Sequence, residues 1–186
     1  DNCTAAGYNA LGSNTTGSHN TAVGHHSLTS NTTASNCTAV GRASLEANTT
    51  GTQNSGFGVN TLAGTTTGTY NIAVGVNSLI SNTTGSYNVG LGVNSLLAAT
   101  TSSGNVAIGF DTLKTCTTGA TYSVAVGFES QKSITTGDNN VTIGYRTLHN
   151  GTTAANNTLI GNTAGYAMTE AVNNVAVGAD SLKAVT

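Results

Sequence analysis

Hydrophobic and polar residues follow a pattern along this chain that returns every 17 residues. Glycines mark it most clearly, because they recur at that interval from Gly7 to Gly178, with one interval of 18 between Gly109 and Gly127. The unit reads N-T/V-A-V-G-x-x-S-L-x-x-N-T-T-G-x-x, and repeat positions 1 to 17 are counted from its first Asn. A fixed period of this kind is the signature of a repeat architecture. The sequence therefore predicts eleven copies of one unit in a single domain, residues 1–186.

Within each unit, the T/V-A-V segment before the glycine predicts a strand. Seventeen residues are too few for a helical hairpin, and Gly, Asn, Thr and Val are poor helix formers. The alternation in Thr21-Ala22-Val23 places positions 2 and 4 on one face of a strand and position 3 on the other. We expect the large apolar residues of position 4 and the Leu of position 9 to form the core. Each coil is expected to hold two or three short strands separated by tight corners.

Stacked units of this kind predict an all-β fold, a parallel β-solenoid (β-roll or β-helix) of about eleven 17-residue coils. Strand spacing would place equivalent residues about 4.8 Å apart and make a rod roughly 50 Å long. Stacking buries a continuous core that no single coil can bury alone. Neither end shows a capping element, so we expect a section of a longer fibre or a subunit that stacks head to tail. The segment 164–168 breaks the repeat pattern and predicts a bulge or a seam.

Three columns of the repeat are assigned structural roles. Stacked Asn side chains at position 1 would form a ladder in which each amide bonds to the next. Gly at position 5 would supply a corner with positive φ or room for a neighbouring backbone. The invariant Thr at position 13 would either bond to the adjacent backbone or join a stacked array of hydroxyls. The ladder residues are Asn20, Asn54, Asn71, Asn88, Asn105, Asn140, Asn157 and Asn174, and the corner residues are Gly24, Gly41, Gly58, Gly75, Gly92 and Gly109.

Position 6, directly after the corner glycine, carries a stripe of apolar residues in the middle of the chain, and position 17 adds tyrosines. On a thin solenoid such a stripe is either a second inward column or a patch that needs a partner. Tyrosines at coil edges suit protein interfaces and sugar faces alike. The candidate interface residues are Val59, Val76, Val93, Phe110, Phe128, Tyr145, Tyr70, Tyr87 and Tyr122.

Composition and charge narrow the expected partners. The chain has 24 glycines, no proline or tryptophan, 6% charged residues and a net charge of -2. No basic stripe is present to neutralise phosphates, so nucleic acid is not an expected partner. No apolar run reaches the ~20 residues of a membrane helix, so membrane insertion is not expected. Three cysteines cannot form a closed set of disulfides. Cys3 and Cys37 would lie two coils apart, too far for a bridge, so they either replace Asn in the buried ladder or pair between chains.

The few charged residues do not indicate catalysis. Glu129 and Arg146 would lie in adjacent coils as an ion pair. Asp111 lies next to Glu129, but Lys114 and Lys132 would stack in the same coils, so the group is interpreted as a compensated charge patch. No catalytic or cofactor-binding residues are therefore assigned, and the chain is predicted not to be an enzyme.

Two further motifs carry chemistry in other proteins. Adjacent histidines can bind transition metals, but His25 and His26 would point to opposite faces if they lay on a strand, so no metal site is assigned. The Asn-Thr-Thr segments match the N-glycosylation sequon. The sequon residues are Asn14, Asn31, Asn48 and Asn82.

The blocks N-I-A-V-G (Asn71 to Gly75) and N-V-A-I-G (Asn105 to Gly109) resemble the SVAIG-type repeat in the heads of trimeric autotransporter adhesins. In that family, parallel coils form a left-handed β-roll and three chains associate around a common axis. The adhesin repeat is shorter, and the complete unit is similar to the NTAIG/NTTG repeats of bacterial surface proteins and phage tail fibres. The resemblance implies a left-handed solenoid, self-association as a homotrimer or a head-to-tail filament, and an extracellular location on a cell surface or a virion fibre.

The leading functional hypothesis is a structural and adhesive segment of an extracellular or virion-surface fibre that assembles with itself. The first alternative is a carbohydrate-binding (receptor-binding) module of a tail fibre, with surface glycans as partners and the Tyr and Asn columns as its contact face. The second is an ice-binding solenoid that uses the threonine column of position 13. The paired T-x-T spacing expected of an ice-binding face is missing there, because the neighbouring positions read Thr-Thr.

Overall fold

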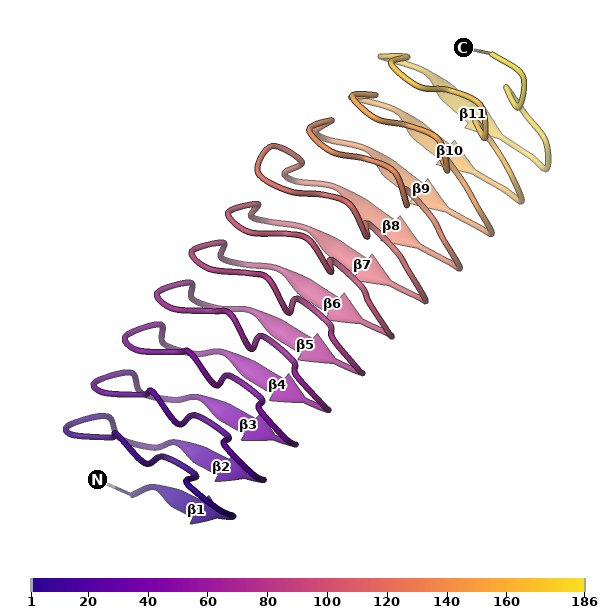
Figure 1. The fold of residues 1–186 in the computed structure, drawn as a ribbon. Coiled ribbons are helices and arrows are strands. Elements are labelled where there is room, and N and C mark those ends of the chain that lie inside the picture. The colour runs from indigo at the N-terminus through magenta and orange to yellow at the C-terminus, as the bar shows by residue number, and fades with distance from the viewer. Residues whose placement is uncertain (1, 186) are drawn as a thin grey trace.

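The chain folds into a long, narrow rod of stacked coils (Figure 1). The computed structural model describes residues 2–185 and shows eleven parallel strands in one sheet, in the order β1 to β11. Neighbouring strands pair in register one repeat apart, as Thr21 with Thr38. The predicted all-β parallel solenoid with its 17-residue coils is confirmed. The strands are β1 Thr4–Ala6, β2 Thr21–Val23, β3 Thr38–Val40, β4 Ser55–Phe57, β5 Ile72–Val74, β6 Val89–Leu91, β7 Val106–Ile108, β8 Val124–Val126, β9 Val141–Ile143, β10 Thr158–Ile160 and β11 Val175–Val177.

Each strand turns its small middle residue, at position 3, toward the core. The prediction that the large apolar residues of position 4 form the core is therefore wrong. Ala73 and Ala107 at position 3 are fully buried, whereas Val74 and Ile108 at position 4 are 39% and 37% exposed. The core is thin, and Leu at position 9 fills it from the opposite wall. A Cβ built on Gly90, at position 3, would lie only 3.4 Å from Cδ1 of Leu79. The wall opposite each Leu therefore accommodates mostly Ala or Gly.

Each coil contains one strand, not the two or three that we expected. Beyond the corner glycine, residues at positions 7 and 9 have positive φ, such as Asn77 at 55° and Leu79 at 53°. A β-strand cannot contain residues with these positive φ values, so the chain returns along the opposite wall in a series of turns. The left-handed conformation costs Leu about 1–2 kcal/mol, which full burial of the side chain offsets by about 1.5–3 kcal/mol. Hydrogen bonds to the next coil hold these turns, including Leu79 N to Ser95 O at 3.0 Å.

The tenth coil is neither the bulge nor the seam that the sequence predicted. Strand β10 pairs in register with both β9 and β11. Leu159 stands at position 3, where most coils have Ala or Gly, and Gly165 stands at position 9, where most coils have Leu. A Cβ on Gly165 would lie 2.7 Å from both Leu159 Cδ1 and Met168 Sδ. In this coil the large residue lies on the sheet side of the core and the small residue lies on the opposite side, so the core stays filled.

The single 18-residue coil absorbs its additional residue at the corner after position 13. Asn105 Nδ2 donates to the carbonyl of Ala120, 15 residues further on, at 2.9 Å. In a regular coil the same bond joins Asn71 to Gly85, 14 residues further on. The next strands pair in register again. The insertion is therefore confined to one corner.

No helix in the described part of the chain is long and apolar enough to cross a membrane.

Candidate interaction surface

The outer side of the eleven-stranded sheet carries exposed apolar side chains along much of the rod. We call it the sheet face and define it as the side chains at positions 2 and 4 of every coil. No charged residue occurs at positions 1 to 5 of any coil. The members of the sheet face are Thr4, Ala6, Thr21, Val23, Thr38, Val40, Ser55, Phe57, Ile72, Val74, Val89, Leu91, Val106, Ile108, Val124, Val126, Val141, Ile143, Thr158, Ile160, Val175 and Val177.

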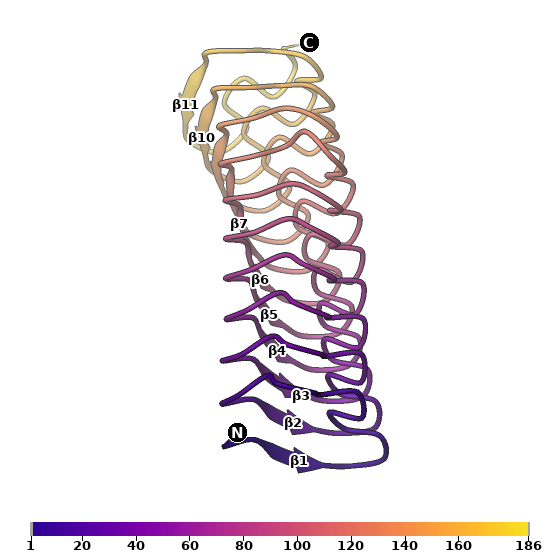
Figure 2. The ribbon, with the colours of Figure 1, turned by 90° about the vertical axis from the view of Figure 1, so that its left-hand side faces the viewer.

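The sheet face runs the whole length of the rod, about 48 Å at a strand spacing of about 4.8 Å. Its two columns lie about 6.8 Å apart, two residues along an extended strand. Valine and isoleucine dominate from β5 onward, whereas Thr and Ser occupy position 2 in β1 to β4. The strands that carry these side chains wind gradually around the rod, from β1 at the front to β11 at the left edge (Figure 2). An uncharged and largely apolar surface of this length is unusual for a soluble monomer and is a candidate interaction site.

The position 6 residues line the corner beyond the sheet, and they point outward instead of forming a second inward column. Val76 and Val93 are 42% and 38% exposed, and Val59 is partly buried. Phe110, Phe128 and Tyr145 stack in sequence, with ring centroids 5.2 and 5.6 Å apart. Each ring therefore covers the face of its neighbour. The stack of Phe110, Phe128 and Tyr145 therefore offers mainly ring edges to a partner. Ring edges are a poor platform for stacking against a sugar.

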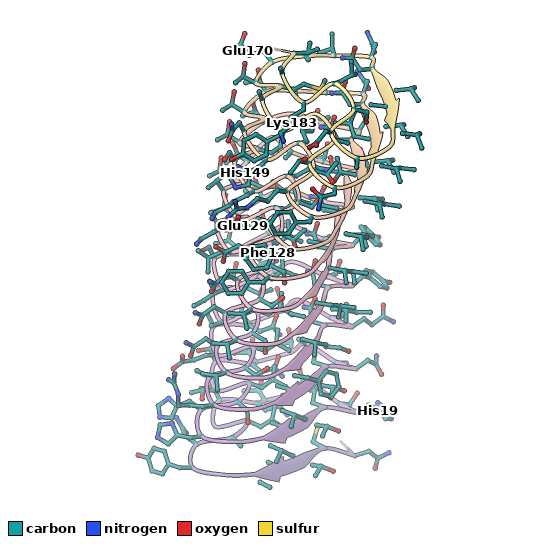
Figure 3. All side chains as sticks on the ribbon, turned by 90° about the vertical axis from the view of Figure 1, so that its right-hand side faces the viewer. His19, Phe128, Glu129, His149, Glu170 and Lys183 are labelled. Atoms are coloured by element: carbon teal, nitrogen blue, oxygen red, sulfur yellow. The ribbon has the colours of Figure 1, made fainter. Side chains whose placement is uncertain are left out.

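The position 17 tyrosines form a second exposed column. Tyr70 and Tyr87 stack with centroids 5.0 Å apart, and Tyr122 lies two coils beyond Tyr87. Figure 3 shows His19, which belongs to the same column, on the opposite side of the rod from Phe128. The predicted interface residues at position 6 and those at position 17 therefore lie on opposite sides of the rod and do not form one patch.

A charged cluster links coils seven to nine on the wall opposite the sheet. We define it as Asp111, Lys114, Glu129, Lys132 and Arg146. The predicted ion pair is present, with Arg146 Nε 2.7 Å from Glu129 Oε2. Lys132 Nζ lies 2.5 Å from Glu129 and 3.6 Å from Asp111, and Lys114 Nζ lies 2.8 Å from Asp111. The cluster joins three consecutive coils.

The two carboxyl groups of this cluster are held ionised. Burial alone would raise the pKa of Glu129, but hydrogen bonds from Lys132 and Arg146 outweigh it, so the pKa is lowered. The pKa of Asp111 is lowered in the same way by Lys114 and by the amide of Asn94, against the effect of burial. Both carboxylates are thus neutralised by fixed cations, which suits cross-linking of coils and not proton transfer.

The position 1 asparagines form a ladder inside the rod. Asn88 Nδ2 lies 3.2 Å from Asn71 Oδ1 and donates to the carbonyl of Ser102 at 2.8 Å, and Asn105 repeats the contact with Asn88. The ladder is interrupted where Cys37 and Ser123 replace Asn. The asparagines of the ladder are almost all fully buried, so they hold the coils together and are not available to a ligand.

The corner glycines combine a positive φ with a close approach of the backbone of the next coil, the two properties considered for them. Gly75 has a φ of 124°, and a Cβ on it would lie 2.7 Å from the carbonyl oxygen of Gly92 in the next coil. The hydroxyls of the position 13 threonines donate to the backbone carbonyl of the next threonine in the column, and not to its hydroxyl. Thr32 Oγ1, for example, donates to the carbonyl of Thr49 at 3.1 Å.

Three of the four sequon asparagines form a second internal column. Asn31, Asn48 and Asn82 are fully buried, and each donates its amide to a carbonyl three residues further along the chain. An attached sugar has no space at these positions in the folded chain.

Two of the three cysteines, Cys37 and Cys116, are buried residues of the core. Cys37 is fully buried, and its N–H donates to Asn20 Oδ1 at 2.9 Å, so it takes an Asn position in the ladder. Burial raises the pKa of the Cys116 thiol to about 11. Cys3 is partly exposed, and all three thiols are free.

The histidine pair contradicts the expected geometry. His25 and His26 lie in a turn, not on a strand, and their rings stack on the same side with centroids 4.2 Å apart and Tyr8 alongside. His26 Nδ1 lies 3.3 Å from Glu46. Within residues 2–185 no group of three or more metal-ligating side chains is present, and no pocket is formed.

The sheet face escaped the sequence reasoning because large apolar residues on a strand were assigned to the core. The signal that identifies it is the small residue, Ala or Gly in most units, between them.

Comparison of the chain with protein-family models, curated proteins and solved structures finds no match.

Proposed function

We propose that this chain is a non-enzymatic structural segment of an extracellular or virion-surface fibre, and that it associates with further copies of itself through the sheet face. The supporting observation is a surface without charged residues along the full length of the rod, on which Val and Ile dominate from β5 onward. A rod of identical coils builds length, and it repeats any weak adhesive contact many times. The resemblance to adhesin heads favours three chains around a common axis.

The energetics favour association. Full burial of a Val, Ile or Phe side chain is worth about 1.5–3 kcal/mol. Nine such side chains of the sheet face are at least 36% exposed, so burying the exposed part of each contributes about 1 kcal/mol. Summed over the sheet faces of two partners, this gross gain is on the order of 20 kcal/mol, against an association cost of about 4–15 kcal/mol. An identical repeat spacing on both partners lets their side chains interdigitate along the whole contact.

The test is the oligomeric state of the chain and of two lysine variants. Ile108→Lys places a charge in the centre of the sheet face, whereas Thr101→Lys places one on an exposed residue outside it. We expect sedimentation analysis to show an oligomer for the parent chain and for Thr101→Lys, and smaller species for Ile108→Lys with unchanged circular dichroism. A parent chain that stays monomeric at high concentration, or an Ile108→Lys variant that stays fully assembled, contradicts the proposal.

Ice binding remains a second candidate because one observation favours it. In coils one to six, positions 14 and 16 carry Thr or Ser on either side of a buried position 15, as in Thr50-Gly51-Thr52 and Thr67-Gly68-Thr69. The paired spacing that appeared to be missing is therefore present, formed by positions 14 and 16. The winding of the coils (Figure 2) limits a flat contact to a few coils. Thermal hysteresis of the purified chain tests this candidate, and its absence removes it.

A further inference from the structure

The stacked pair Tyr70 and Tyr87 has the geometry of a covalent modification site. The rings are almost parallel, 7° apart, with centroids 5.0 Å apart. They are 48% and 63% exposed, so solvent and small oxidants reach both phenols. Among the described residues this is the one stack formed by two tyrosines, because Tyr145 stacks on Phe128 and Tyr166 on His149.

The backbone holds the two rings in this arrangement. Both residues lie in the left-handed region, with φ of 59° for Tyr70 and 61° for Tyr87. The N–H of Tyr87 donates to the carbonyl of Thr69 at 3.0 Å, and that of Tyr70 donates to Thr52 at 3.2 Å. Neighbouring coils therefore hold the backbones of both tyrosines in the same conformation, with the two rings stacked side by side.

The rest of the chain offers few competing targets for one-electron oxidation. It has no Trp and a single Met, Met168, which is fully buried. Cys37 and Cys116 are also fully buried, and burial raises the pKa of both thiols. Cys3 is partly exposed but lies in the first coil. An oxidant in solution therefore meets tyrosines as the principal accessible oxidisable side chains along the middle of the rod.

We propose that Tyr70 and Tyr87 are a site of oxidative coupling to dityrosine, which staples the fourth coil to the fifth. The co-reactant is a peroxide acting through a one-electron oxidation catalyst of the peroxidase class. Each phenol loses one electron and its phenolic proton, and the two phenoxyl radicals form a carbon–carbon bond between their ortho carbons. The two ortho hydrogens then move to the oxygens as the rings regain aromaticity. The peroxide accepts two electrons and two protons and leaves as water.

The neighbouring tyrosine provides a matched control within the chain. Tyr122 is in the same column and is 69% exposed, but Gly104 occupies the coil between it and Tyr87. Tyr122 therefore has equal access to oxidant and no stacked tyrosine. Coupling directed by geometry uses the pair and spares Tyr122, whereas coupling directed by exposure alone consumes Tyr122 before Tyr70 and Tyr87.

The experiment treats a dilute mixture of unlabelled and ¹⁵N-labelled chains with limiting hydrogen peroxide and a peroxidase. Dityrosine is followed by its fluorescence, and the cross-linked peptides are identified by mass spectrometry. We expect a Tyr70–Tyr87 peptide that has lost two hydrogen atoms and contains no mixed isotopes, since both rings belong to one chain. Tyr87→Phe keeps the ring stack and should lose this product, whereas Tyr122→Phe should keep it.

Three results would overturn the inference. They are a dityrosine yield unchanged in Tyr87→Phe, cross-linked peptides of mixed isotope content only, and consumption of the tyrosines without formation of dityrosine. None of these depends on self-association through the sheet face, because the predicted bond forms within one chain.

Discussion

The Asn ladder allows a quantitative prediction at Asn88. Substitution by Ala removes the amide that donates to the Ser102 carbonyl at 2.8 Å and the oxygen that accepts the Asn105 N–H at 3.0 Å. Ser102 and Asn105 are fully buried, so water does not replace the lost partners. Each buried group left without a partner costs about 1–3 kcal/mol, so Asn88→Ala should lower the free energy of unfolding by about 4 kcal/mol.

The matched control for this change already exists in the chain. Ser123 occupies the same column, and its hydroxyl accepts the N–H of Asn140 at 3.2 Å. Asn88→Ser should therefore restore a partner for the Asn105 N–H and cost about half as much as Asn88→Ala.

Repeat proteins can unfold in sections, so the assay combines urea unfolding with hydrogen exchange of the Asn105 amide. We expect that amide to lose protection in Asn88→Ala and to keep most of it in Asn88→Ser. Equal stability of the two variants, or unchanged protection of the Asn105 amide in Asn88→Ala, would refute the reasoning.

Three other predictions address the interior. An oligosaccharyltransferase added to the folded chain should leave the three buried sequon asparagines unmodified, and peptide mass spectrometry would reveal any attached glycan as evidence against their burial. An alkylating reagent at neutral pH should modify Cys3 in the folded chain and Cys116 only after denaturant is added; Cys116, whose pKa is about 11, also loses its stabilising contribution as the pH rises from 9.0 toward that value. Leu159→Ala should cost about 2–5 kcal/mol, and adding Gly165→Leu should recover most of it; thermal unfolding that shows no recovery would contradict the exchange of volumes.

The columns of the sequence were sufficient to predict the stacking but not which side of the strand is buried. A 17-residue period with identical residues at fixed positions has few solutions other than coils in register, and adjacent coils also brought Glu129 and Arg146 together. The direction of the strand side chains depends on how wide the interior is. That width is set by Leu79 and its equivalents on the opposite wall, and the one local sign of it is the small residue next to Val74, Ala73, which is fully buried.

The turns were harder to predict because they contradict residue preferences. Leu seldom adopts positive φ, yet every Leu at position 9 does so here, with φ between 49° and 54°. Burial in the shared core overrides the local preference. Asn at position 7 was the available signal, since Asn tolerates this conformation better than most residues. The same turns explain why His25 and His26 share a side, which a strand would not allow.

The corner that absorbs the additional residue between Asn105 and Tyr122 gives the rod a property useful for engineering. Because the hydrogen bond to Ala120 is made despite the change in length, the strands on both sides keep their pairing. A peptide grafted at that corner of any coil should therefore leave the neighbouring coils undisturbed. The chain can serve as a scaffold that displays several peptides at distances equal to chosen multiples of the coil spacing.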